Sequence, residues 1–212
     1  MGCQTANATR PRPSILSDVT AIIAMKNQLR EAAKLARANA FRRHGTAAAE
    51  RIAARGLSFA APQPDATVSA FAAIGEEIDP APLVLRLRAE GFRICLPVMQ
   101  GKARPLLFRA WDAGDPLAER MWGIREPLPS APEVDPDVIL APLLAFDRAG
   151  YRLGYGAGFF DRTLVAARER KPIIAIGLAY DEQEVDAVPH LDYDQRLDWV
   201  LTPSGPLRCV GN

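Results

Sequence analysis

Apolar positions along this chain alternate between a helical spacing and short uninterrupted runs. Helical spacing covers 18–41, 46–60 and 159–171, and a further helix is expected to begin at Asp79 and to stop at Gly91. Apolar runs typical of buried strands occupy 66–74, 92–99, 106–111, 138–146, 172–180 and 199–201. Because strands alternate with helices, the pattern predicts an α/β fold, a three-layer α/β/α domain with a mainly parallel sheet.

The beginning of the chain lacks this pattern. Residues 1–17 combine prolines with small polar residues, so we expect a flexible tail there, followed by one compact domain over 18–212. Ser17 or Asp18 is expected to cap the first helix.

Composition narrows the functional classes. The net charge is +1, from 26 basic and 25 acidic residues, so no overall field attracts nucleic acid or an anionic membrane. The apolar runs are too short to span a bilayer. Three scattered cysteines without metal-ligand spacing suit a reducing compartment, and we expect a cytoplasmic location. Only two histidines are present, which disfavours a histidine-based zinc site and a Ser-His-Asp triad.

Four basic residues repeat at helical spacing in the first helix: Lys26, Arg30, Lys34 and Arg37. A charged stripe on a helix usually faces solvent, so the pattern alone favours a solvated face. His44 follows in the loop after this helix and is expected to be exposed and inert. His190 is expected to order its own loop, since no partner for proton transfer is visible in the sequence.

A glycine-rich stretch follows the buried strand 138–146 and a turn at 147–150. Gly154, Gly156 and Gly158 alternate, which lets the backbone take positive φ and approach a ligand closely. The helix 159–171 begins directly after them. A strand, a glycine-rich turn and a helix N-terminus together make a site where backbone N–H groups can hold phosphate.

The residues that flank these glycines decide between two interpretations. The stretch is neither a Walker A loop nor a dinucleotide fingerprint, and a tight structural turn is the alternative. Arg152 precedes the glycines, and Asp161 and Arg162 follow them. Because guanidinium groups suit phosphate oxygens and a carboxylate suits Mg²⁺, the flanks favour a phosphate site.

At this stretch the chain resembles a known family. Phe146-Asp-Arg-Ala-Gly-Tyr-Arg-Leu-Gly-Tyr-Gly-Ala-Gly-Phe-Phe-Asp161-Arg162 is similar to the signature of the 5-formyltetrahydrofolate cyclo-ligases, also called 5,10-methenyltetrahydrofolate synthetases. Weaker similarity runs from Lys26 to Thr202. The resemblance implies the fold shared with ribose-5-phosphate isomerase and CoA-transferase-like proteins. It also implies ATP- and Mg²⁺-dependent cyclisation of 5-formyltetrahydrofolate to 5,10-methenyltetrahydrofolate, with release of ADP and phosphate. We expect the enzyme to be a monomer.

The resemblance assigns roles to residues that spacing alone leaves open. The catalytic residues it implies are Lys26, Arg152 and Asp161. The ATP-binding residues it implies are Lys26, Asn27, Gln28, Leu29 and Arg30, followed by Arg152, Leu153, Gly154, Tyr155, Gly156, Ala157, Gly158, Phe159 and Phe160. The substrate-binding residues it implies are Ala72, Glu77, Trp122, Tyr155 and Phe159. For Mg²⁺ it implies Asp161 and Asp194. Of the basic stripe, only Lys26 and Arg30 are thereby moved from the solvated face to the site.

The chain departs from the family pattern at three positions, and two rival functions stay open. Ala157 stands where glycine or a basic residue is common, and Phe159 and Phe160 stand where tyrosines are common. Ala157 then needs a negative φ or a tolerable left-handed strain. The rivals are a folate- or nucleotide-binding regulator without turnover and another small-molecule phosphoryl-transfer enzyme. For Trp122, a core anchor and a pterin-stacking role are equally open.

Overall fold

The computed structural model describes residues 15–120 and 123–210, and a seven-stranded sheet forms its centre. Its strands lie in the order β11 (Gly205–Arg208), β10 (Trp199–Thr202), β9 (Ile174–Leu178), β6 (Val138–Pro142), β1 (Thr67–Ser69), β2 (Arg93–Val98) and β3 (Leu107–Ala110). From β10 to β2 every neighbouring pair is parallel, whereas the edge strands β11 and β3 are antiparallel. The mainly parallel sheet predicted from the sequence is therefore confirmed.

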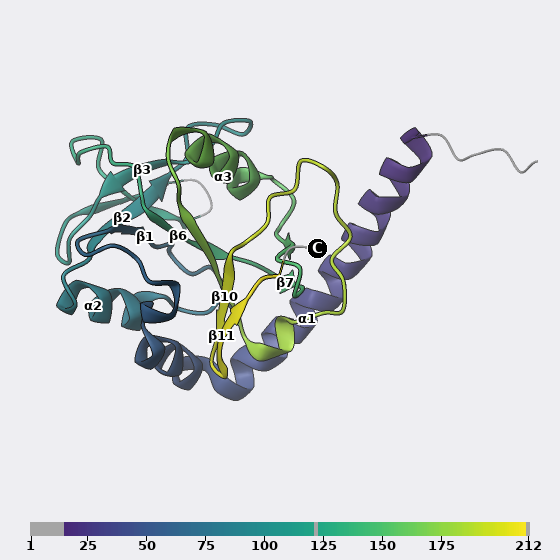
Figure 1. Ribbon diagram of the computed structural model, residues 1–212, viewed down its shortest axis with the longest axis horizontal. Helices are drawn as coiled ribbons and strands as arrows, with labels where there is room; N and C mark the ends of the chain where they lie inside the picture. The colour runs from purple at the N-terminus through teal and green to yellow at the C-terminus, as the bar shows by residue number, and fades with distance from the viewer. Residues whose placement is uncertain (1–14, 121–122, 211–212) are drawn as a thin grey trace, which may run out of the picture.

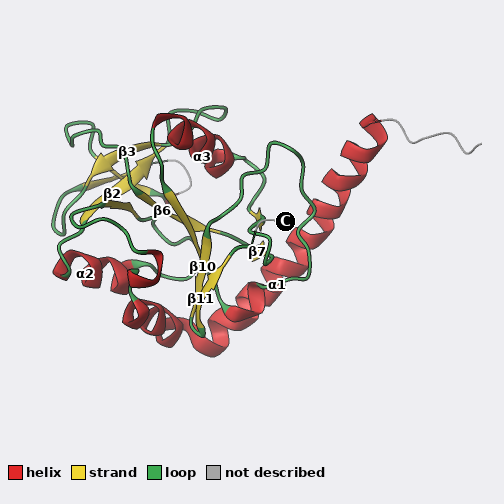
Figure 2. Ribbon diagram, in the orientation of Figure 1, coloured by secondary structure: helices red, strands yellow, loops and turns green. Residues whose placement is uncertain are grey.

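Helices cover both faces of this sheet (Figures 1 and 2). On one face lie α2 (Ala81–Ala89) and the C-terminal part of α1 (Ile15–Arg55), and on the other lies α3 (Phe159–Arg170). Short 3₁₀ turns lie at Ser58–Ala60 and Asp181–Gln183. The N-terminal turns of α1 extend away from the sheet (Figure 1).

The core is divided by the sheet into two layers. Along β6, Val138 and Leu140 pack with α1 and α2, whereas Ile139 and Ala141 pack with Leu164 of α3 and its neighbours. All four β6 residues are fully buried. This strand reads as a continuous apolar run because both of its faces are covered by helices.

The first helix differs from its prediction at both ends. It begins at Ile15, inside the predicted tail, and residues 1–14 lie outside the described residues. The two predicted helices run on as one element with a kink at Gly45, where φ is 34° and ψ is −121°. His44 therefore lies in a helix rather than in a loop. The kink falls where the sequence predicts a break, because glycine tolerates this backbone conformation.

The run 138–146 is also divided. β6 ends at Pro142, and β7 (Ala145–Phe146) then pairs antiparallel with β8 (Arg152–Leu153). Proline has no N–H to continue the ladder, which explains the end of β6. Four strands were not predicted: β4 (Leu117–Glu119), β5 (Arg125–Pro127), β8 and β11. β1 is shorter than the predicted strand 66–74.

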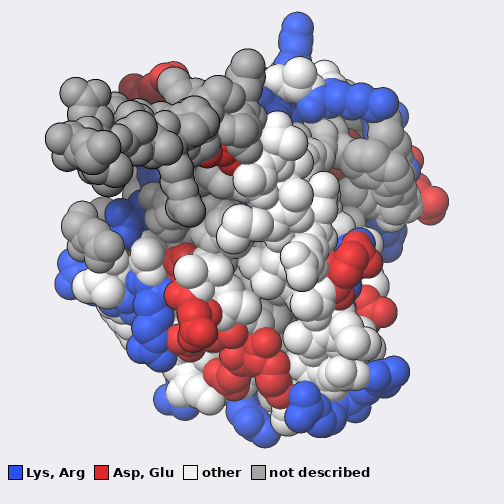
Figure 3. Space-filling view, turned by 90° about the vertical axis from the view of Figure 1, so that its right-hand side faces the viewer, with Lys and Arg blue, Asp and Glu red and all other residues white. Residues whose placement is uncertain are grey.

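The surface carries both signs of charge. On the described part of the face in Figure 3, acidic side chains gather in the lower half and basic side chains border them. Among the described residues, no helix is long and apolar enough to cross a membrane.

Candidate active site

The glycine-rich loop 154–158 connects β8 to α3. Gly156 has a φ of 104°, and Gly158, which caps α3, has a φ of 68°. The φ of Ala157 is not positive, so the alanine at this position fits without left-handed strain. The first-turn N–H groups of α3 have no partners within the helix, which suits an anion.

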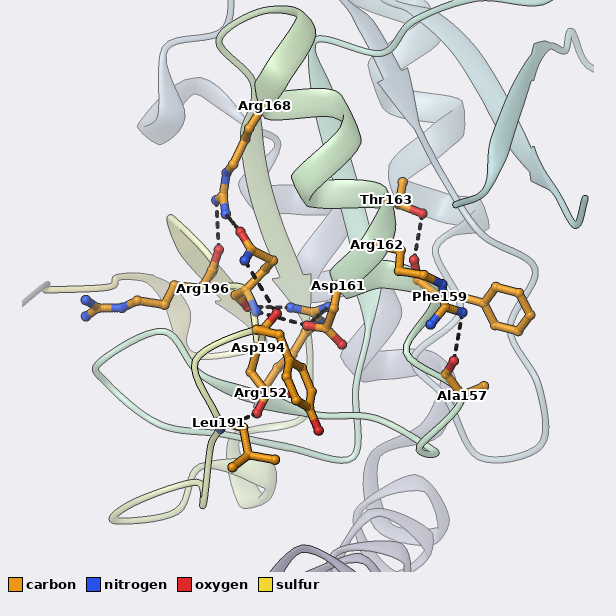
Figure 4. Close-up of polar contacts among 12 residues, drawn as sticks. Arg152, Ala157, Phe159, Asp161, Arg162, Thr163, Arg168, Leu191, Asp194 and Arg196 are labelled. Carbon is orange, nitrogen blue, oxygen red and sulfur yellow. Dashed lines mark hydrogen bonds and ion pairs between the residues drawn. The ribbon is translucent and has the colours of Figure 1, made fainter. Parts of the chain in front are cut away.

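Asp161 lies in the first turn of α3 and points to two partners. Its Oδ1 accepts a hydrogen bond from Arg152 Nη2 at 2.9 Å and another from the Gln195 backbone N–H at 3.0 Å. Arg152 also donates from Nη1 to the Gln195 carbonyl at 2.6 Å. Asp161 makes no capping hydrogen bond, so its carboxylate is positioned by Arg152 and the 191–196 loop (Figure 4).

Asp194 lies beside this pair, on the loop before β10. Its Oδ2 accepts a hydrogen bond from the Leu191 N–H at 2.6 Å and forms an ion pair with Lys26 Nζ of α1. Lys26 is 9% exposed, so this ion pair is nearly buried. The structure therefore brings Lys26 and Asp194 together from 168 residues apart in the sequence.

Arg30 lies one turn after Lys26 and contacts the glycine-rich loop. Its Nε donates to the Gly154 carbonyl at 2.9 Å, and its Nη1 donates to Asn27 Oδ1 at 2.5 Å. A Cβ at Gly156 would lie 3.3 Å from the Arg30 guanidinium. Among the other predicted ATP residues, Asn27 and Gln28 are exposed, and Leu29 packs against the small core cluster that contains Leu153.

Glu77 lies in the turn after β1 and is 5% exposed. Its Oε2 accepts a hydrogen bond from the Ile74 N–H at 2.9 Å, and its Oε1 lies 3.6 Å from Arg37 Nη1. Burial raises the pKa of this carboxyl, while the Ile74 hydrogen bond and the Arg37 charge lower it, and the net direction is upward. Ala72, in the same turn, is exposed.

The aromatic residues of the loop differ in exposure. Tyr155 is 54% exposed, and the Arg162 guanidinium lies 5.3 Å from the centroid of the Phe159 ring. Phe160 packs against the core below α3, so at most its backbone faces the loop. Trp122 lies outside the described residues.

Two arginines differ from their predicted surroundings. Arg37 was predicted on a solvated face with Lys34, yet it is 3% exposed and contacts Glu77 and Tyr155. Arg162 is occupied by backbone carbonyls: it donates to Ala157 at 2.8 Å and to Lys102 at 3.0 Å, and it turns away from Asp161 (Figure 4). Arg162 therefore fastens the loop and is not free for a phosphate.

A signal for Arg37 was present in the sequence. Lys26, Ala33, Arg37 and Ala40 are all buried, at spacings of seven, four and three. These positions lie on one side of an α-helix, whereas exposed Lys34 does not share that side. The buried alanines thus mark which basic residues turn inward.

Neither histidine joins the site. His44 Nε2 lies 3.0 Å from Glu182 Oε1, so this side chain is half-buried and paired rather than exposed and inert. His190 stacks on Tyr151 with a centroid distance of 3.6 Å and contacts the Val188 carbonyl through Nδ1 at 3.1 Å. These contacts agree with the prediction that His190 orders its loop.

Asp161 and Asp194 are chemically suitable for a hard cation. They flank Arg152, and Asp161 Oδ2 accepts no hydrogen bond from any described residue. The described residues contain no group of three or more possible metal ligands. Mg²⁺ is commonly held by one or two carboxylates together with water and substrate phosphates, so two aspartates fit it.

The site lies where α1, β8, α3 and the 191–196 loop meet. A groove of about 570 Å³ lies elsewhere, beside β2 and β3, and contains none of the predicted site residues. We identify the site by its converging charged groups and its glycine-rich loop, because an enclosed volume alone carries no chemistry.

Residues 22–203 match the sequence pattern of the 5-formyltetrahydrofolate cyclo-ligase family. Two proteins with that enzyme name, from Mycolicibacterium smegmatis and Escherichia coli strain K12, are each 38% identical over 65% of this chain. These matches cover 73% and 78% of the two proteins, respectively. The NMR structure of Aquifex aeolicus 5,10-methenyltetrahydrofolate synthetase is similar at a TM-score of 0.70 and 25% identity, covering 89% of this chain and 94% of that one.

Proposed function

Because this chain belongs to the 5-formyltetrahydrofolate cyclo-ligase family, we propose that it uses ATP to convert 5-formyltetrahydrofolate to 5,10-methenyltetrahydrofolate, with release of ADP and phosphate. One observation supports this most: cations from α1 meet the glycine-rich loop beside two aspartates. Lys26 pairs with Asp194, and Arg30 donates to Gly154. Phosphoryl transfer requires mainly such positioning and charge neutralisation.

The phosphates of ATP are proposed to bind on the glycine-rich loop and at the start of α3. The loop N–H groups and the helix N-terminus hold the phosphate oxygens, and Lys26 and Arg30 neutralise their charge. Arg152 is 5% exposed and bound to Asp161 and Gln195, so its proposed role is to orient the carboxylate of Asp161. The charge of Arg152 then acts on the phosphates at short range.

Asp161 and Asp194 are the residues that would hold Mg²⁺. When bound, this ion would neutralise negative charge on the phosphates of ATP. Asp161 Oδ2 accepts no hydrogen bond within the described part of the chain, and Asp194 is paired with a lysine that the phosphates can also engage.

The proposed chemistry has two steps. A formamide oxygen is a poor leaving group, so the formyl oxygen first attacks the γ-phosphorus of ATP, and the bond from that phosphorus to ADP breaks. Nitrogen N10 then attacks the activated formyl carbon, phosphate leaves with the former formyl oxygen, and N10 loses its proton. Neither step requires a covalent nucleophile from the protein.

The folate side of the site is proposed to lie at the turn after β1. Glu77 would orient the substrate, with Ala72 and the rings of Tyr155 and Phe159 beside it. Tyr155 is the best placed of these side chains for an incoming ring, because it is exposed and belongs to the same loop as the phosphate site. The substrate role of Trp122 also stays a proposal.

Titration of the two substrates tests this division. We expect Glu77→Gln to weaken 5-formyltetrahydrofolate binding by roughly 2 kcal/mol, about thirtyfold, because a charge-assisted hydrogen bond is lost. ATP affinity should change little. Glu50→Gln, an exposed change on α1, is the control. Loss of ATP affinity with intact folate affinity in Glu77→Gln would reverse the proposed assignment of the two subsites.

The two rivals predict different outcomes. A regulator without turnover would bind both ligands and form no methenyl product, and another kinase would form ADP without that product. Retention of Lys26, Glu77, Asp161 and Asp194 together in the chain argues against the regulator. We further propose that the enzyme acts as a monomer in the cytoplasm.

A further inference from the structure

Arg37 is a buried guanidinium at the boundary between the two proposed subsites. It lies on α1, seven residues after Arg30, and is 3% exposed. Arginine is rarely buried to this degree without a dedicated carboxylate partner. The carboxylates near Arg37 are Glu77 and Glu76.

The guanidinium reaches both subsites at once. Its Nη2 donates to the Tyr155 hydroxyl at 2.5 Å, and its carbon lies 5.4 Å from the centroid of the Tyr155 ring. Its Nη1 lies 3.6 Å from Glu77 Oε1. Tyr155 belongs to the glycine-rich loop and Glu77 to the turn after β1, so one side chain connects the proposed ATP and folate sides.

Stability of this arrangement does not explain the arginine. Its Nε and Nη1 are buried and form no hydrogen bond with any described residue. Buried donors that make no hydrogen bond cost free energy. Glu76 Oε2 lies 3.7 Å from Nη2 and adds a second, more exposed carboxylate to the same guanidinium. A cation retained under such conditions points to a functional role.

We propose that Arg37 is a positioning residue that fixes Glu77 and Tyr155 relative to each other and thereby couples folate binding to ATP binding. The inference rests on the proposed function, since it needs both ligands to bind. A ligand that moves Tyr155 on the glycine-rich loop changes the position of the guanidinium. Glu77 then follows, because Arg37 is its cationic partner, and the second ligand meets a site that is already ordered.

The Arg37 charge also affects the state of Glu77. Burial raises the pKa of Glu77, and the Ile74 N–H and Arg37 oppose that rise. Removing the guanidinium leaves the buried carboxyl with the Ile74 N–H as its hydrogen-bond donor and without the nearby positive charge of Arg37. The position of the Glu77 carboxyl relative to the substrate would then be less well fixed.

The test is the ratio of two dissociation constants for a non-hydrolysable ATP analogue, measured without and with saturating 5-formyltetrahydrofolate. We expect this coupling factor to be about fivefold or more in the wild-type protein. In Arg37→Gln it should fall to about one. Arg42→Gln, an exposed arginine of the same helix, should keep the wild-type factor. A purely structural defect that weakens both measurements equally cancels in the ratio.

Two further variants keep the test decisive if Arg37→Gln folds poorly. Tyr155 is exposed, and Tyr155→Phe removes only its hydroxyl, which accepts the hydrogen bond from Arg37. This variant should lower the coupling factor as well. Arg37→Lys keeps the charge and should give an intermediate value.

The outcomes separate the inference from the proposed function. A wild-type factor near one, or a wild-type factor retained in folded Arg37→Gln and in Tyr155→Phe, overturns the coupling role. A wild-type protein that binds neither ligand overturns the proposed function instead.

Discussion

Asp161 accepts two hydrogen bonds with one carboxylate oxygen, and this arrangement indicates a role other than capping α3. Oδ1 receives both Arg152 and the Gln195 N–H, which leaves Oδ2 without a protein partner among the described residues. The sequence alone allowed a capping role, but Gly158 caps α3 and Asp161 makes no capping bond. Its carboxylate charge is thus available to the site.

We predict that Asp161→Asn abolishes most turnover while the protein stays folded. Asparagine can still accept the Gln195 N–H, so the loss of the Arg152 ion pair should cost on the order of 1–2 kcal/mol. Raising the Mg²⁺ concentration should restore part of the rate, because the anion that a hard cation prefers is gone. The measurements are turnover at several Mg²⁺ concentrations and the denaturation midpoint. Asp192→Asn, an exposed change in the neighbouring loop, is the control. Wild-type turnover of Asp161→Asn at limiting Mg²⁺ would refute the metal assignment.

At the residue level, the sequence reveals the spacing within a local motif but not which side chains of a helix are buried. The glycine-rich loop with Arg152 and Asp161 is contiguous, so its spacing could be interpreted directly. Arg37 and Lys34 look alike in the sequence, yet one is buried and the other exposed. Their difference depends on which side of α1 packs against the rest of the protein. Only Ala33 and Ala40, which are buried, indicate that side.

At the level of elements, the turn between β7 and β8 sets the position of the glycine-rich loop. The Gly150 N–H donates to the Asp147 carbonyl at 3.0 Å, and Gly150 has a φ of 94°. A Cβ at this position would lie 2.6 Å from the Leu197 carbonyl oxygen and 3.0 Å from Cys209 Cβ. The turn therefore requires glycine for two reasons, its backbone angle and its crowding.

We predict that Gly150→Ala destabilises the protein clearly more than Gly114→Ala. Gly114 has a similar φ of 99°, but a Cβ there would meet nothing within 4 Å. Both variants pay for the backbone angle, about 1–2 kcal/mol, and only Gly150→Ala adds the steric clash, for a total on the order of 3 kcal/mol. Chemical denaturation measures both. Equal losses would show that the carbonyl contact does not matter.

Asp137 connects three elements at the other end of the sheet. Its Oδ2 accepts the Thr67 N–H of β1 at 2.7 Å, and its Oδ1 accepts Lys171 Nζ, just after α3, at 2.7 Å. Burial tends to raise the pKa of Asp137, but these hydrogen bonds and the nearby positive charges outweigh it and lower the pKa. Asp137 precedes β6, so it ties the start of the central strands to the end of α3.

The lowered pKa makes this contribution depend on pH in a defined direction. Because the folded pKa lies below the unfolded value of about 3.9, the stabilisation is present above that value and is lost as pH falls through the folded pKa. Asp137→Asn should therefore cost most near neutral pH and progressively less below about pH 4. Its side chain is 39% exposed, so the cost should stay near 1 kcal/mol or less. Urea denaturation from pH 7 to pH 2.5 measures it, with exposed Asp186→Asn as the control. A cost that grows toward low pH would contradict the assignment.

Most helices and strands follow from hydrophobic spacing, whereas the breaks between them do not. The central strands and α3 lie within the predicted ranges because both faces of the sheet are covered, which gives uninterrupted apolar runs. The division of 138–146 at Pro142 and the added strands β4, β5, β8 and β11 depend on antiparallel pairing with the adjacent segment of the chain. Spacing within one segment does not reveal such partners.

At the level of the whole molecule, the site depends on α1, which contacts three segments that are distant from it in the sequence. α1 supplies Lys26 to the 191–196 loop, Arg30 to the glycine-rich loop, and Arg37 to the turn after β1. Each contact spans a large sequence separation, for example 124 residues from Arg30 to Gly154. Family resemblance indicated Lys26 and Arg30, but no local pattern indicated that the same helix also reaches Glu77.

The most direct measurement is formation of 5,10-methenyltetrahydrofolate from 5-formyltetrahydrofolate by the purified full chain, followed together with ADP. The proposed function predicts product only when ATP and Mg²⁺ are both present, with one ADP released for each methenyl product. ADP release and product formation must be coupled, because the formyl oxygen leaves as part of the phosphate that ATP donates. Product formed at full rate without ATP, or ADP released without methenyl product, would contradict it.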